Sequence, residues 1–175
     1  MKILIVLFLV LLFASLWDLK KGKIPNLLIA AGAIYGLMRI IYYQNFFIHI
    51  WGIVFPILIL YPFFKIGTIG AGDIKLFSLI GYYVSFMEVI YCIFLAFVIS
   101  AIFSLISMKR KGNFIERISY LMSYLKECIS QKQFRYYYQD LNKNKFSPKE
   151  IRKTKIHLAL PIFISVFIYF GGGFL

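Results

Sequence analysis

Acidic residues are scarce in this chain. Only seven of its 175 residues are Asp or Glu, against 20 Lys and Arg. The resulting net charge of +13 raises the question of nucleic-acid binding, but the basic residues lie in the gaps between long apolar runs. That placement is typical of membrane proteins, whose cytoplasmic loops carry an excess of Lys and Arg. We therefore expect no nucleic-acid partner, and we expect the basic loops to attract a bilayer with an anionic inner leaflet.

Cysteine is also nearly absent. Cys92 lies inside an apolar run, Cys128 lies in a basic segment, and no Cys-x-x-Cys pair occurs. The sequence therefore indicates neither a disulfide framework nor a zinc site. We expect no metal and no cofactor.

Most residues of the chain are hydrophobic. The chain is 61% hydrophobic, with 19 Phe and 13 Tyr, which excludes an ordinary soluble domain. Several runs approach the roughly 20 apolar residues that a helix needs to cross a bilayer. We predict an all-α, polytopic transmembrane bundle of about six spans in a single domain, 1–175. The expected spans are residues 3–17, 27–43, 46–64, 76–86, 89–107 and 156–170.

The fourth and fifth spans come from one apolar stretch, residues 76–107. As a single helix it would be about 48 Å long, against a hydrocarbon core of about 30 Å, so we expect a break, at Glu88. With six spans and the N-terminus outside, the loops 18–26, 65–75 and 108–155 face the cytoplasm. These loops hold 18 of the 20 Lys and Arg, as the positive-inside rule requires. Both termini are then outside.

The loop 108–155 is the longest polar segment. Its apolar residues follow helical spacing with Lys and Arg between them, which predicts an amphipathic helix on the inner leaflet. The first 17 residues have an alternative interpretation as a signal peptide. The three lysines after this run outweigh Lys2, and no clear cleavage site precedes Asp18, so we favour a first span.

Two of the scarce acids, Asp18 and Asp73, stand at the ends of apolar runs, where ionisable groups are costly and usually functional. If the bundle brings the two carboxylates together, they share one proton. The ionised carboxylate then takes a proton from water, and the protonated one polarises a peptide carbonyl. Taken singly, Asp18 equally suits an interfacial charge, and Asp73 equally suits a helix N-terminal cap.

The residues around Asp73 have physical uses of their own. Gly70 and Gly72 lack a Cβ, so the backbone can approach a substrate strand closely. Lys75 suits either a lipid-headgroup anchor or an electrostatic influence on Asp73. We assign both histidines to interfacial packing and Glu88 to a loop.

Two segments together resemble one known family. Residues 18–26 read DLKKGKIPN, and residues 70–76 read GAGDIKL. This is similar to the two aspartate motifs of the type IV prepilin peptidases, in the same order and with the same six-span layout. The resemblance implies that Asp18 and Asp73 are catalytic, with Gly70, Gly72 and Lys75 supporting the active-site loop. It also implies cleavage of the leader peptide of prepilin-like precursors at the cytoplasmic membrane face.

The chain resembles the short form of the family, found with tight-adherence (Flp) pili. It has no extra cytoplasmic region with paired cysteines, so the resemblance implies no methyltransferase activity. Three alternatives stay open: an archaeal-type preflagellin peptidase, a transporter or proton relay with paired carboxylates, and a non-enzymatic assembly factor. The precursor, the bacterial or archaeal pilin system and the oligomeric state are left open as well.

Overall fold

The structure, a computed structural model, describes residues 2–43, 46–110, 119, 122 and 157–171. This part of the chain is helical and contains no strand, which confirms the predicted all-α class. Most of the loop 108–155, with its expected amphipathic helix, lies outside the described residues. The main helices are α1 (Lys2–Lys21), α2 (Asn26–Tyr43), α3 (Phe46–Lys65), α4 (Ala71–Gly81), α5 (Phe86–Arg110) and α9 (Ala159–Gly171).

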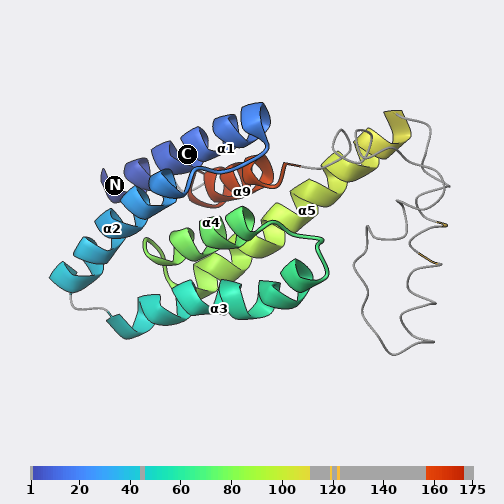
Figure 1. Ribbon diagram of the computed structural model, residues 1–175. Helices are drawn as coiled ribbons and strands as arrows, with labels where there is room; N and C mark the ends of the chain where they lie inside the picture. The colour runs from blue at the N-terminus through green and yellow to red at the C-terminus, as the bar shows by residue number, and fades with distance from the viewer. Residues whose placement is uncertain (1, 44–45, 111–118, 120–121, 123–156, 172–175) are drawn as a thin grey trace.

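Successive helices run in opposite directions, so that α1 ends near the start of α2 and α3 ends near the start of α4, whereas α5 extends well beyond the start of α9 (Figure 1). Helix α4 is the central one, because it packs against α2, α3, α5 and α9. Helix α1 lies against α9 and α2. Asp73 therefore belongs to the innermost helix, whereas Asp18 belongs to one of the helices around it.

Helix α4 is short and begins earlier than the sequence suggested. It covers 11 residues, about 16 Å, and starts at Ala71 rather than at residue 76. The break in the stretch 76–107 lies at residues 82–85, and Glu88 belongs to the first turn of α5. The Glu88 carboxylate accepts the Ser85 N–H over 2.6 Å. The prediction of a break at Glu88 was wrong because an acid near a helix N-terminus satisfies a free N–H and starts the helix.

His49 lies at the C-terminal end of α4. Its Nδ1 lies 3.1 Å from both the Gly81 and the Val84 carbonyl oxygens, and the side chain is buried. We assigned His49 to interfacial packing from the sequence, and the structure shows its side chain buried against two backbone carbonyl oxygens. Gly81 also touches α3, because a Cβ built there would lie 2.3 Å from the Gly52 carbonyl. The two helix backbones meet at this point.

The outer surface of the bundle is apolar. Large side chains such as Leu27 and Phe47 are 82% and 84% exposed, whereas most residues of α4 are buried. Water-soluble proteins rarely expose apolar patches on this scale. Within the described residues, α5 is the one helix whose length and composition suffice to cross a membrane.

Candidate active site

Asp18 lies in the last turn of α1. The helix ends because Gly22 adopts a left-handed φ of +63°, and its N–H donates to the Asp18 carbonyl over 2.7 Å. A left-handed glycine is the usual residue just after a helix. The helix thus runs past Asp18 and holds its side chain on the bundle side, where the residue is only 7% exposed.

The partner of this carboxylate comes from the other end of the sequence. Asp18 Oδ2 lies 3.1 Å from Nδ1 of His157, which directly precedes α9. The His157 side chain is 35% exposed, against 10% for Asp18. A hydrogen bond of this kind holds the carboxylate in one rotamer. His157 is therefore not the isolated interfacial residue that we expected.

Asp73 is the third residue of α4. Its Oδ2 accepts the N–H of Gly70 over 3.2 Å, which is the contribution that an acid makes in a capping box. Gly70 itself has an extended backbone, with φ −79° and ψ 148°. Asp73 thus caps the N-terminus of α4. The sequence had left this role open beside catalysis. The contact with the Gly70 N–H holds the carboxylate at the positive end of the helix.

The two motifs of the sequence meet at this end of the bundle. A Cβ built on Gly72 would lie 3.1 Å from Ile24 Cδ1, so the missing side chain makes room for Ile24. Lys75 Nζ donates to the Asn26 Oδ1 over 3.0 Å. Residues 18–26 therefore touch residues 70–76 through one apolar and one polar contact. The distance between the two segments along the chain did not predict these contacts.

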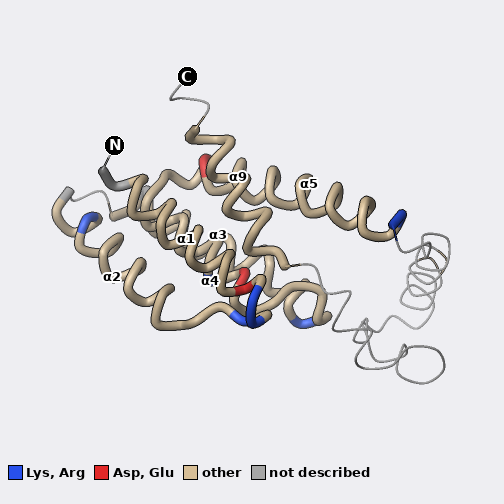
Figure 2. The backbone as a smooth tube through the Cα atoms, turned by 90° about the horizontal axis from the view of Figure 1, so that it is seen from above, with Lys and Arg blue, Asp and Glu red and all other residues tan. Residues whose placement is uncertain are grey.

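The surroundings of the two aspartates are basic. Lys20 and Lys21 occupy the last turn of α1, and Lys65 the last turn of α3. Figure 2 shows basic positions gathered where these helices end, near the acidic positions on α1 and α4. Lys21 also lies over the Trp17 ring, 4.3 Å from its centroid, an arrangement typical of a cation–π contact. Basic residues gathered in this way attract anions.

The site contains two separately held carboxylates, a histidine and a lysine. In the described part of the chain, no three His, Cys, Asp or Glu side chains lie close enough to hold a metal ion. The sequence pointed to the aspartates, the glycines and Lys75, and it missed His157. Asn26 was part of the recognised motif, but its contact with Lys75 was not expected. Nothing in the spacing of the chain links residue 157 to residue 18.

These features define a helical bundle with a carboxylate site at the C-terminal end of α1 and the N-terminal end of α4. The model of the type IV leader peptidase family matches residues 5–105. The match covers more than half of the chain, and the protein therefore belongs to this family of membrane leader peptidases. No curated protein and no solved structure matches the chain significantly. The matched range contains both aspartates, whereas His157 lies beyond it.

Proposed function

We propose that this protein is an aspartic endopeptidase that removes the leader peptide of type IV prepilin-like precursors at the cytoplasmic membrane face. The observation that carries the proposal is the interlocking of the two motifs, in which Lys75 bonds Asn26 over 3.0 Å and Ile24 packs on Gly72. Asp18 and Asp73 each belong to one of these motifs. Their meeting therefore supports a shared site for the two carboxylates.

The apolar exterior supports a multi-pass topology in the cell membrane, with a lipid-covered outer surface. Helix α4 is shorter than the roughly 30 Å hydrocarbon core, but it is buried among four other helices. Polar turns at membrane depth are tolerated when protein surrounds them. The lysines in the last turns of α1 and α3 support a cytoplasmic position for this end of the bundle, in line with the positive-inside rule. Both termini then lie outside.

In the proposed reaction, one aspartate is ionised and the other carries a proton. The ionised carboxylate removes a proton from water, and the water oxygen bonds to the carbonyl carbon of the scissile peptide. The proton of the other carboxyl group passes to the carbonyl oxygen. The carboxyl group that took the proton from water then passes it to the nitrogen, the carbon–nitrogen bond breaks, and a hydroxyl of the tetrahedral intermediate returns a proton to the other carboxylate. The cytoplasmic end of the bundle supplies the water.

His157 gives the two aspartates different environments. Its contact holds the Asp18 side chain in one orientation, whereas the Gly70 N–H holds that of Asp73. In this proposal His157 is a positioning residue, since it acts through Asp18. The roles of acid and base stay unassigned between the two carboxylates.

The test is to co-express the full-length protein with the pilin-like precursor from the same genome and to follow the precursor's size. Asp18→Asn and Asp73→Asn should each slow processing by about 10²–10⁴-fold, the usual contribution of a general acid or base. Asn at position 73 still accepts the Gly70 N–H, so α4 should keep its start. Glu88→Gln is the matched control and should process normally, because Glu88 starts α5 at the other end of α4.

Normal processing by both aspartate variants would refute the aspartic mechanism. Ion or proton flux in liposomes that both variants abolish, without any cleavage, would instead support a transporter. A preflagellin-type precursor that is cut in place of a pilin precursor would keep the mechanism and change the substrate.

A further inference from the structure

A polar pocket lies between the last turn of α1 and the start of α2. It has a volume of about 650 Å³. Gly22, with its left-handed φ of +63°, ends α1 and turns the chain toward α2, so that residues on both sides of the turn surround the pocket. The described lining residues are Trp17, Lys21, Lys23, Ile24, Pro25 and Asn26.

The charge of the lining favours an anion as the ligand. Among the described residues that line the pocket, Lys21 and Lys23 are cations and none is acidic. The nearest acid along the chain, Asp18, is buried against His157 and does not line the pocket. Both lysines are exposed, so their ammonium groups are open to a ligand. An ammonium group binds phosphate as a compact point charge with three N–H donors.

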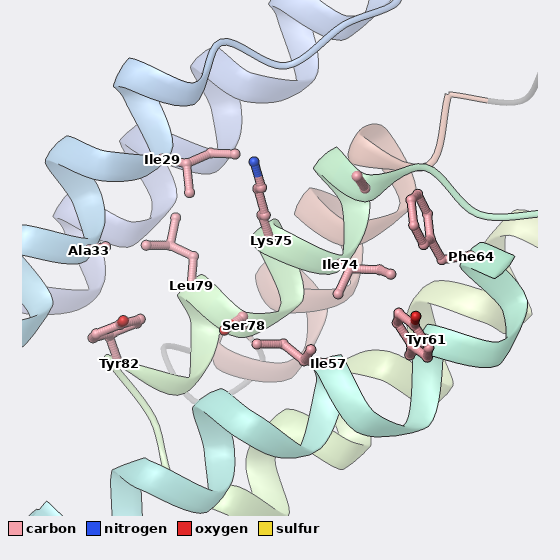
Figure 3. Close-up of a pocket in the computed structure, with 11 residues that line it drawn as sticks. Ile29, Ala33, Ile57, Tyr61, Phe64, Ile74, Lys75, Ser78, Leu79 and Tyr82 are labelled. Carbon is pink, nitrogen blue, oxygen red and sulfur yellow. The ribbon is translucent and has the colours of Figure 1, made fainter.

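Helix α4 adds a third cation beside this pocket. Lys75 Nζ donates to Asn26 Oδ1 over 3.0 Å, and Asn26 is a lining residue. Figure 3 shows the Lys75 side chain reaching from α4 toward α2, beside Ile29 and at the edge of the groove between α2 and α3. The contact uses the acceptor of the Asn26 amide and leaves its NH₂ group as a donor. The polar groups at this side of the pocket therefore also suit an anion.

The surface next to the pocket favours a lipid as the carrier of that anion. Phe13, Trp17 and Lys21 are spaced by four residues, so they follow one another on neighbouring turns of one side of α1. Phe13 is 56% exposed and Trp17 44% exposed, and Lys21 Nζ lies 4.3 Å from the centroid of the Trp17 ring. The row thus passes from apolar to aromatic to cationic, which matches the acyl chain, the interface and the headgroup of a phospholipid. Free phosphate matches only the cationic end.

We propose that this pocket is a discrete binding site for the phosphate group of an anionic phospholipid, with Lys21 and Lys23 as the cations and an acyl chain along the exposed row of α1. The site differs from the general attraction of basic loops to the inner leaflet, because that attraction does not depend on which lysine carries the charge. All lining residues except Trp17 belong to the segment 18–26, so a bound headgroup contacts the first aspartate motif. The proposal requires a membrane-embedded bundle and does not require that a precursor is cut.

Lipid binding to the purified full-length protein in detergent tests the site. Native mass spectrometry counts bound lipids, and the lipid-induced rise in Tm gives the affinity. Short-chain phosphatidylglycerol should bind saturably and more tightly than phosphatidylcholine of the same chain length, whose choline group is a cation. Lys21→Met and Lys23→Met should each weaken phosphatidylglycerol binding about fivefold, the usual contribution of one lysine at an anionic membrane surface. Lys20→Met is the matched control and should leave binding unchanged, because Lys20 is an exposed lysine of the same helical turn that does not line the pocket.

Three results would overturn the site: equal losses for Lys20→Met and the two pocket variants, equal binding of the two lipids, or inorganic phosphate that binds the wild type as tightly as phosphatidylglycerol. Lys23→Arg keeps the cation and should retain most of the binding, and a loss as large as that of Lys23→Met would also contradict the proposal. The Tm of each variant without lipid reports its folding. If Lys21→Met lowers that Tm, the comparison of Met and Arg at position 23 decides. No precursor is present in these measurements, so a failure of the proposed peptidase function leaves their outcome unaffected.

Discussion

Asp18 and His157 are 139 residues apart in the sequence, yet Oδ2 of one lies 3.1 Å from Nδ1 of the other. The contact joins the end of α1 to the start of α9 at the first aspartate motif. It also brings residue 157, which lies outside the matched family range, next to an aspartate inside that range.

Removing the histidine should slow the reaction through Asp18. His157→Leu deletes the donor and should lower kcat about tenfold, the effect of losing a hydrogen bond to a charged group. His157→Asn keeps a nitrogen near the position of Nδ1 and should stay within about threefold of the wild type. Cleavage rates and the amount of protein in the membrane are measured for both. Equal kcat values for the leucine variant and the wild type would show that the contact has no positioning role.

A methyl group at position 72 should be tolerated only if the Ile24 side chain moves. Gly72→Ala places its Cβ 3.1 Å from Ile24 Cδ1, and we expect processing to fall several-fold, by a cost of about 1 kcal/mol. Ile24→Val removes that terminal carbon. The double variant should therefore recover most of the lost rate, and failure to recover would mean that Gly72 is needed for another reason, such as contact with the substrate.

The hydrogen bond between Lys75 and Asn26 should appear as a coupling between the two motifs. Lys75→Met and Asn26→Ala each break the same contact, so the double variant should lose little more activity than either single one. A double-mutant cycle on the cleavage rate should give a coupling of about 0.5–3 kcal/mol. Lys65→Met is the control, because Lys65 is an exposed lysine at the end of α3. If the rate losses of the two single variants add up in the double variant, the two side chains act independently.

Among the glycines that the structure describes, Gly81 should be the least replaceable for stability. A Cβ there meets the Gly52 backbone at 2.3 Å, and a backbone cannot move aside as a flexible side chain can. Gly81→Ala should destabilise the protein by about 1–3 kcal/mol and lower its Tm in detergent. Gly171→Ala is the matched control, since its nearest neighbour is 3.8 Å away. Similar Tm values for the two variants would contradict the close helix contact.

Much of the helical architecture was readable from the chain. The apolar runs predicted spans 27–43 and 46–64, and the helices cover Asn26–Tyr43 and Phe46–Lys65. The boundaries near residues 71–88 were predicted poorly, because Asp73 and Glu88 look like loop charges in a hydropathy pattern. Each instead accepts a backbone N–H and starts a helix. Local capping overrides average hydropathy at these points.

The sequence by itself determined the all-helical class and the family, and it pointed to two candidate aspartates, since apolar runs and short motifs are local patterns. Only the tertiary structure decided which side chains surround those aspartates. His157 reaches Asp18, Asn26 reaches Lys75, and a groove opens between α2 and α3. These relationships depend on how helices pack across long stretches of chain. A single sequence does not specify that packing, because one apolar face can pack against several others.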